Sequence, residues 1–419
     1  MEKNIYKLSK WSLENLNDLS IIEKEDIVKL DKVLDKEYNE EMQFLNVLAL
    51  IIGEDKVFSN RETFIKYSNP EKYYAEEDDE NELPPSDIVA YTELRSCADL
   101  IRLYDSGKGK LVIQPDFQRD VVWDKASQTR FIDSLTKQLP IPSLCFSLDY
   151  RTQKRLVIDG LQRIKSIINF LTDENWRLSK LDDIDENLGG KRVSDIKRDN
   201  PELFEIVENV TIPITVLRCD YSKSDHNSYL FTIFHRLNSG GKKLTNQEIR
   251  NCIYHGTFND LLMKNVNNKK FRKILNLKDN KGYRFKYEEY ILRFYAFLEN
   301  YKSYTGGMAK FLNTYMLKNK NLKDTELEKM KLLFDETVEL IFERISNKKQ
   351  LKISNTVFEA LMIGVASNKD KLKKSKADLS TKFNKMIDSP EFTEAKLRGG
   401  LANKERVHER IDRAIKVFS

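Results

Sequence analysis

The sequence predicts an α+β protein, in which a small domain of strands and helices precedes an all-helical C-terminal domain. Short apolar runs with strand character occur only in the first half of the chain, and turn residues separate them. Beyond about residue 225, apolar residues recur with the helical period instead. The segments with this period are 287–297, 326–345, 357–366 and 405–418.

The length of 419 residues predicts several parts, because single cores stop growing at about 250–300 residues. An acidic run, Glu76 to Glu82, precedes Pro84-Pro85 and indicates a solvated linker. We predict an N-terminal helical segment with this linker over residues 1–85, the mixed domain over 86–222 and the helical domain over 223–419.

Within the mixed domain, periodicity predicts helices that alternate with strands. Asp124 is placed to cap a helix whose apolar face carries Phe131, Ile132, Leu135 and Leu139. The predicted elements are a helix over 93–104, a strand over 111–113, a helix over 125–139, strands over 144–148 and 155–158 around a turn at 150–153, and a strand over 211–217.

A strand-to-helix corner at Asp159-Gly160 is the first candidate site. The strand 155–158 precedes it, and a helical stripe of Ile164, Ile167, Ile168 and Leu171 follows it. Glycine allows a sharp turn and close approach of a ligand, and a helix N-terminus attracts anions. Arg163 lies in the first turn, so the pattern is typical of a phosphate site. The alternative is a surface arginine beside a turn carboxylate that caps the helix.

A second candidate site follows a helical stripe that ends at Leu237. Asn238-Ser239-Gly240-Gly241 can end this helix, and successive amides in such a turn can bind an anion, with Lys242 and Lys243 adding charge. Thr245 with Glu248 forms a capping-box pattern for the next helix. We expect Asn238 and Gly240 near the site, with Arg250 behind them. The alternative is a plain helix–turn–helix corner.

Several of these segments resemble the GmrSD-type restriction-enzyme N-terminal domain family. Phe117-Gln118-Arg119 with Trp123 is similar to the family's F-Q-R…W segment, Pro140-Ile141-Pro142 to its P-I-P segment, and Asp159-Gly160-Leu161-Gln162-Arg163 to its D-G-Q-Q-R motif. Residues 234–251 are similar to its R-L-N-S-G-G…L-T…Q-E-I-R segment, and the resemblance extends over about 91–419, with a helical tail. Leu161 departs from the family motif, which has a polar residue there.

The resemblance implies a ParB/sulfiredoxin-like fold that binds and hydrolyses nucleoside triphosphates with Mg²⁺. Such domains are the sensing half of bacterial systems that restrict modified or foreign DNA. Asp159, Gln162 and Arg163 would then be catalytic, and Asp159 would hold the metal. The nucleotide would contact Gln118, Arg119, Gly160, Asn238, Gly240 and Gly241. This chemistry is reasonable, because an arginine fork binds phosphate oxygens and Mg²⁺ needs only one or two protein carboxylates.

Longer family members carry a C-terminal HNH-type nuclease domain, which needs clustered metal ligands. Beyond residue 250 the chain contains only His255 and His408, far apart in sequence, so we expect a separate nuclease subunit, or a site that the motifs do not reveal, to cut any DNA. Two further hypotheses remain open. The protein could bind DNA without nucleotide chemistry, through Arg119, Arg163 and the basic stretch 264–284, or Leu161 could make it a catalytically silent scaffold.

Composition excludes several other classes of protein. The net charge of +5 is small for a chain in which a third of the residues are charged. No apolar run can cross a bilayer, and no signal-peptide pattern opens the sequence. Four cysteines without a C-x-x-C pair predict buried thiols, no zinc site and a cytoplasmic protein. The aromatic stretch with Tyr290, Phe294 and Phe297 on one helical face predicts core packing.

Overall fold

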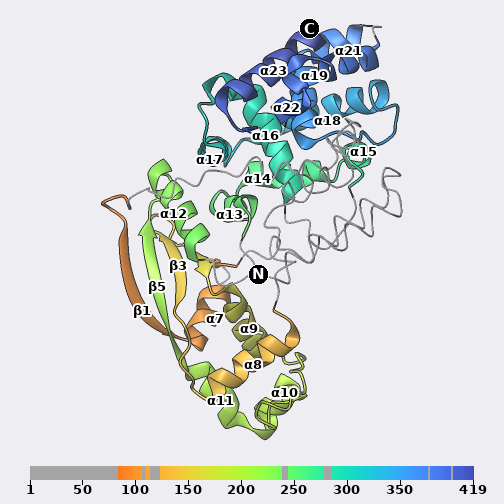
Figure 1. Ribbon diagram of the computed structural model, residues 1–419. Helices are drawn as coiled ribbons and strands as arrows, with labels where there is room; N and C mark the ends of the chain where they lie inside the picture. Colours follow the sequence, from red (N-terminus) through yellow and green to blue (C-terminus); the bar gives the residue numbers. More distant parts are fainter. Residues whose placement is uncertain are drawn as a thin grey trace, which may run out of the picture.

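The structure of this chain is a computed structural model that describes residues 84–105, 109–113, 123–237, 244–277, 285–375, 378–397 and 400–419. Residues 1–83 of the helical segment and acidic linker predicted over 1–85 lie outside the described residues. Figure 1 shows a sheet with helices packed beside it, and the C-terminal helices gathered at the opposite end. The predicted α+β class is therefore confirmed.

A five-stranded mixed sheet is the centre of the mixed domain, with strand order β1-β5-β3-β4-β2. β1 and β5 are antiparallel, β5 and β3 parallel, β3 and β4 antiparallel, and β4 and β2 parallel. The bounds are β1 Val89–Ser96, β2 Leu111–Val112, β3 Leu144–Asp149, β4 Arg155–Asp159 and β5 Thr211–Cys219. The four strands predicted from the sequence are all present, and β1 is additional.

Both faces of the inner strands are covered by helices, whereas most of the edge strand β1 is exposed. In β4, Val157 belongs to a buried cluster with α7 to α11, whereas Leu156 and Ile158 belong to the cluster that contains α12 and the C-terminal helices. Apolar residues of a strand alternate between faces, so a continuous apolar run predicts burial on both sides. The helices are α7 Cys97–Asp105, α8 Lys125–Thr136, α9 Leu161–Thr172, α10 Val193–Asp199, α11 Pro201–Asn209 and α12 Ser224–Leu237.

The predicted helix over 93–104 is wrong at its start. Residues Glu93 to Ser96 are the end of β1, and the helix begins at Cys97. Every residue of β1 pairs with β5, for example Glu93 with Ile214. Glu, Leu and Arg favour a helix locally, but pairing with a strand more than a hundred residues away outweighs that preference.

The predicted helix over 125–139 ends three residues early, at Thr136. Gln138 has a positive φ of 50°, which a right-handed helix cannot contain, and Leu139 is 50% exposed, so its predicted place on the apolar face is wrong. Phe131, Ile132 and Leu135 are buried as predicted, and Asp124 caps the helix by accepting the Ser127 N–H at 2.7 Å.

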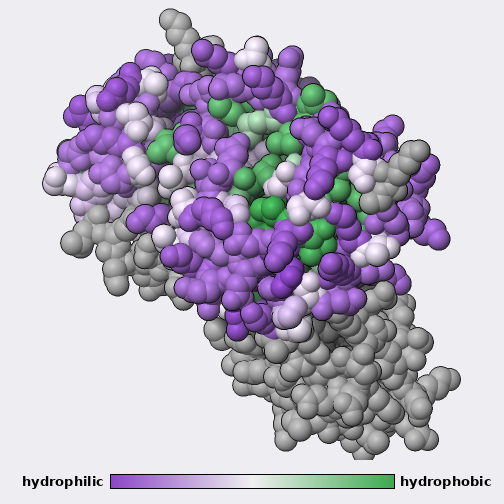
Figure 2. All heavy atoms as spheres, turned by 90° about the horizontal axis from the view of Figure 1, so that it is seen from above, coloured by the Kyte–Doolittle hydropathy of each residue, from purple (hydrophilic) through white to green (hydrophobic). Residues whose placement is uncertain are grey.

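The C-terminal half of the described chain contains helices and no strand. Seen from above, its surface is mainly hydrophilic, and hydrophobic residues show in a hollow near the middle (Figure 2). Its helices are α13 Asn246–Ile253, α14 Thr257–Val266, α15 Lys269–Ile274, α16 Lys286–Asn300, α17 Met308–Asn319, α18 Asp324–Arg344, α19 Asn355–Ser367, α20 Lys369–Lys374, α21 Leu379–Ile387, α22 Glu394–Leu397 and α23 Lys404–Phe418, with short 3-10 turns at Tyr301–Ser303 and Pro390–Phe392.

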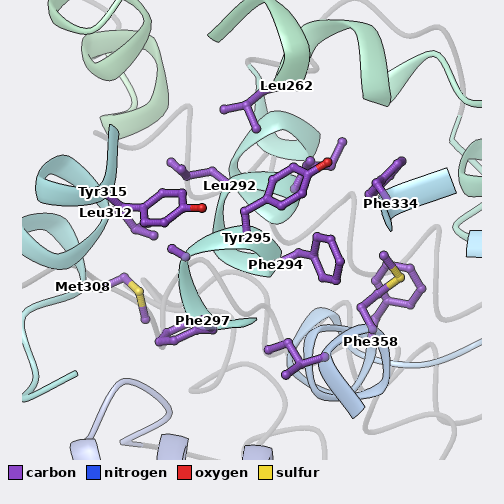
Figure 3. Packing of buried hydrophobic residues seen from close by; sticks show 14 of the residues in the cluster. Leu262, Leu292, Phe294, Tyr295, Phe297, Met308, Leu312, Tyr315, Phe334 and Phe358 are labelled. Carbon is purple, nitrogen blue, oxygen red and sulfur yellow. The ribbon is translucent and has the colours of Figure 1, made fainter. Parts of the chain in front are cut away.

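Helix α16 is the centre of this half. Figure 3 shows Phe294, Tyr295 and Phe297 of α16 among buried side chains of the surrounding helices, including Phe334 of α18. The rings of Phe294 and Phe334 lie 5.9 Å apart, edge to face. Core packing is thus confirmed for Phe294 and Phe297, but Tyr290 is only partly buried.

The four cysteines are free and buried, as predicted. Burial raises the pKa of the Cys97 thiol to about 12, and the pKa of Cys252 is also raised well above its ordinary value by burial. These thiols are protonated at neutral pH, and within the described residues no group of three or more His, Cys, Asp or Glu is arranged to hold a metal ion.

Asp87, just before β1, ties the start of the mixed domain to α12. Its Oδ1 contacts Nε2 of the buried His226 at 2.8 Å, and its Oδ2 forms an ion pair with Lys223. The backbone N–H of Asp220 donates to His226 Nδ1 at 2.9 Å, which leaves Nε2 as the donor to Asp87. The hydrogen bonds from Lys223 and His226 hold the pKa of Asp87 at about 2, below its ordinary 3.8.

This lowered pKa predicts a pH-dependent contribution to stability. Because the folded carboxyl has the lower pKa, Asp87 stabilises the fold fully above pH 3.8, and the effect is lost as the pH falls towards 2. We expect Asp87→Asn to melt below the wild type at pH 7, and the difference to shrink between pH 4 and pH 2. A difference that stays constant over this range would contradict the assignment.

Helices α19 and α23 cross at Gly364, which lies against the backbone of Ala414. A Cβ atom at Gly364 would be 2.9 Å from the carbonyl carbon and oxygen of Ala414. Real Cβ atoms do not approach backbone this closely, so any larger residue must move one helix away from the other.

Gly364→Ala is therefore expected to destabilise the helical half by about 1–3 kcal/mol, the usual range for overpacking. The urea midpoint measured by circular dichroism at 222 nm reports the change. Ser367→Ala, at an exposed position of the same helix, is the matched control and should leave the midpoint almost unchanged. Equal midpoints for Gly364→Ala and wild type would show that the helices can separate without cost.

Candidate functional site

The corner between β4 and α9 requires glycine at position 160. Gly160 is the N-cap of α9 and has a φ of +92°, which L side chains rarely adopt. A Cβ atom there would lie 2.2 Å from Cδ2 of Leu144 on β3. The corner predicted from Asp159-Gly160 is therefore present, and the chain passes directly over β3.

Arg163 braces this corner. Its Nη2 donates to Asp159 Oδ2 at 2.7 Å, and its Nη1 donates to the carbonyl of Pro142 and, at 3.4 Å, to that of Ser143. The Arg163 side chain is only 12% exposed, whereas that of Asp159 is 37% exposed. Arg163 thus joins α9 to the loop before β3, and the carboxylate is the more accessible partner of the pair.

Gln162 holds the segment before α8. Its Oε1 accepts the backbone N–H of Trp123 at 3.2 Å. The carbonyl of Trp123 in turn accepts Gln128 Nε2 at 2.9 Å, and the indole packs edge to face on Phe131 with ring centroids 5.6 Å apart. This bond places Trp123 beside the first turn of α9.

Three segments that are far apart in sequence therefore meet at one corner: Trp123, the Pro142–Ser143 loop and the Asp159–Arg163 turn. Residues 98–255, which include all three, match the family model described as GmrSD restriction endonuclease, N-terminal domain. The chain carries a GmrSD-type N-terminal domain. No curated protein and no solved structure matches the chain.

The resemblance in sequence motifs predicted a family segment over about 91–419, but the family model matches only residues 98–255. The matched segment begins within α7 and ends just after α13, so it includes α12 and α13 as well as the corner. The predicted boundary between residues 222 and 223 stays a prediction. The matched model describes the N-terminal domain of a restriction endonuclease, and the match covers residues 98–255 of this chain. None of the helices that the structure describes is long and apolar enough to cross a membrane.

Five predicted nucleotide contacts lie outside the described residues: Gln118, Arg119, Asn238, Gly240 and Gly241. The elements that flank 238–243 are described. His235 Nε2 contacts Asn246 Oδ1 at 2.7 Å, which joins the end of α12 to the start of α13. The predicted capping box is confirmed, because Thr245 accepts the Glu248 N–H at 3.2 Å and Glu248 Oε2 accepts the Thr245 N–H at 2.6 Å.

Arg250 of α13 is fully buried within the helical half. Its Nη1 lies 3.3 Å from Glu289 Oε2, and its Nε donates to Asn313 at 2.9 Å, so it joins α13 to α16 and α17. Burial favours the neutral form of Glu289, but Arg293 and Arg250 outweigh it and hold the pKa of this carboxyl below its ordinary value. These contacts give Arg250 a structural role, and its predicted support of the nucleotide site stays a prediction.

Cys145 lies opposite Asp159 in the β3–β4 ladder. Burial and the negative charge of Asp159 raise the pKa of this thiol to about 12, so it is protonated at neutral pH. Asp159 is the partly exposed carboxylate of the corner among the described residues. The other oxygen of this carboxylate, Oδ1, accepts no hydrogen bond from the residues that the structure describes.

Lys165 is a candidate that sequence reasoning missed. It is half-buried, burial lowers its pKa, and within the described chain its amine has no hydrogen bond or ion pair. It lies one turn after Leu161 on the same helix face, and side chains on a helix lean towards its N-terminus. The sequence signal for Lys165 was its positive charge two residues after Arg163. It was overlooked because this helix was predicted from its apolar residues.

Gly160→Ala is expected to destabilise the corner by at least about 2 kcal/mol, because a left-handed backbone costs 1–2 kcal/mol and the clash with Leu144 adds to it. Chemical denaturation measures the loss. Gly109→Ala is the control, since Gly109 also has a positive φ, +52°, but has no atom within 4 Å of the added Cβ. Equal losses for the two variants would show that contact with Leu144 contributes nothing.

Proposed function

We propose that this protein is the nucleotide-binding component of a bacterial restriction-like defence system and hydrolyses nucleoside triphosphates at the Asp159–Arg163 corner. One observation carries the proposal: Trp123, Pro142 and the Asp159–Arg163 turn, which belong to three of the family's motif segments, meet at the N-terminus of α9 beside a half-exposed carboxylate. The N-terminus of a helix that follows a strand is a common phosphate site in α/β proteins.

The N-terminus of α9 supports binding of the phosphates. The N-cap of this helix is Gly160, which has no side chain to cap it, and the positive end of the helix dipole attracts an anion. Lys165 can add a positive charge along the same turn. Arg163 then serves mainly to hold the turn against the Pro142–Ser143 loop, and its remaining N–H groups can donate to a phosphate oxygen.

The corner is compatible with Mg²⁺ only when phosphates share the ion. Asp159 offers one carboxylate, of which Oδ2 is paired with Arg163. Magnesium keeps several waters and accepts one or two protein carboxylates plus substrate phosphates, so this donor set is sufficient. When bound, the ion would neutralise phosphate charge during transfer.

Leu161 favours a second candidate function, a nucleotide-gated switch without turnover. The family motif has a polar residue here, whereas Leu161 packs against the apolar cluster beneath the sheet. The loss of one polar contact commonly costs only about 1–3 kcal/mol, so nucleotide could still bind. DNA binding in place of nucleotide chemistry stays a prediction, and it would show as affinity that falls steeply with salt.

Phosphate release and binding should be measured with ATP, GTP, CTP and UTP, each with Mg²⁺. We expect Asp159→Asn to lower phosphate release on the order of 10²-fold, because the nearly isosteric amide removes the charge that holds the ion. Asp183→Asn is the matched control, since Asp183 forms an ion pair with Arg130 in the same domain, at 2.7 Å and on the surface.

The possible outcomes separate the two candidates. A wild type that binds nucleotide but releases no phosphate would support the switch. If Leu161→Gln then released phosphate, the lack of hydrolysis in the wild type would be due to Leu161. A wild type that binds none of the four nucleotides at millimolar concentration would end both proposals.

A further inference from the structure

A cavity of about 350 Å³ lies in the helical half, outside the segment that matches the GmrSD-type family. The end of α15, the start of α16 and the segment before α19 form it. Leu275, Leu277, Leu351 and Ile353 give it apolar walls. Its volume is at the lower end of the range for small-molecule sites.

Two tyrosines of α16 form the aromatic part of this cavity. The rings of Tyr287 and Tyr290 lie 6.0 Å apart at an interplanar angle of 62°, and Asn355 of α19 donates a hydrogen bond to the Tyr290 hydroxyl. This bond fixes one ring in place. Tyr290 is thus a wall of the cavity, which explains why it is less buried than Phe294 and Phe297 on the same face of α16.

The charge on this cavity is positive. Its described lining includes Lys286 and Lys352 and no carboxylate. The Lys286 amine lies 6.0 Å from the Tyr290 ring centroid. Lys352 is exposed at the rim, and no ion pair involves it among the described residues.

Polar amides complete the lining. Asn276 has a left-handed backbone with a φ of 50° at the end of α15, and Gln350 lies beside the apolar wall. Side-chain amides offer a donor and an acceptor together, which suits the edge of a nucleobase and does not suit a hydrocarbon chain.

We infer that this cavity binds one nucleotide unit, with the base against the tyrosines, its edge near the amides, and the phosphate beside the lysines. Base–aromatic stacking with nearby cationic side chains is how proteins bind single nucleotides and unpaired strands. The same chemistry is found in a free nucleotide and in one nucleotide of a DNA strand. This site is separate from the triphosphate site proposed at Asp159.

The test uses the full chain with two probes, 2-aminopurine riboside monophosphate and a single-stranded oligonucleotide that contains one 2-aminopurine. Stacking on tyrosine quenches this fluorescent base, so titration gives affinity directly. Lys352→Glu should weaken binding of the probe that the site prefers by about tenfold or more, since it replaces a phosphate contact with a repulsive charge. Tyr287→Ala should reduce the quenching as well as the affinity.

Lys329→Glu, an equal charge change at an exposed position of α18, should leave both titrations unchanged. Preference for the monophosphate supports a free nucleotide, and preference for the oligonucleotide supports a strand. Tyr287→Phe keeps the ring and should retain quenching even if Tyr287→Ala folds poorly. The inference would be overturned if the wild type quenched neither probe. It would also be overturned if Lys352→Glu and Lys329→Glu bound the probes with equal affinity.

The triphosphate proposal can fail without affecting this result. A monophosphate lacks the β- and γ-phosphates that the Asp159 corner would bind, so its titration reports the cavity. Asp159→Asn should leave quenching unchanged, and Lys352→Glu should leave triphosphate hydrolysis unchanged.

Discussion

Burial of β3 and β4 on both faces is the constraint on which the rest of the molecule depends. Phe146 and Val157 face the helices of the mixed domain, whereas Leu156 and Ile158 face α12 and the cluster that continues into the C-terminal helices. A strand with no solvent-facing side can present polar groups only at its ends. The carboxyl end of β4 is Asp159, so the polar groups of the corner lie where the buried apolar run of this strand stops.

The same constraint explains why the motif residues are so strongly interconnected. At the end of a buried strand the chain turns over Leu144, which excludes any side chain at position 160. Arg163 then satisfies the carbonyls of the Pro142–Ser143 loop, and Gln162 satisfies the amide of Trp123. Gln162 and Arg163, which the motif suggests as ligand contacts, therefore also hold together the turn that a ligand would contact.

Sequence reasoning succeeded where local pattern and burial agree. The apolar runs in β3 and β4, the caps at Asp124 and Thr245, and the stripe of α9 all depend on neighbours within a few residues. It failed where long-range contacts decide: Glu93 to Ser96 pair with β5, Leu139 follows a left-handed Gln138, and Tyr290 faces a cavity. The hydrogen bonds from Arg163 to the carbonyls of Pro142 and Ser143 also could not be predicted, because sequence spacing does not show which donors already have a partner.

Placement of the thiols has a consequence for how the cell could control this protein. All four cysteines lie in apolar surroundings, and none has a pKa low enough to form thiolate at neutral pH. Oxidants and electrophiles react with the thiolate form of cysteine. Because the four thiols of the folded chain are protonated at neutral pH, they react slowly with both. The four thiols of this chain would therefore resist a redox burst that oxidises cysteines of lower pKa in other proteins.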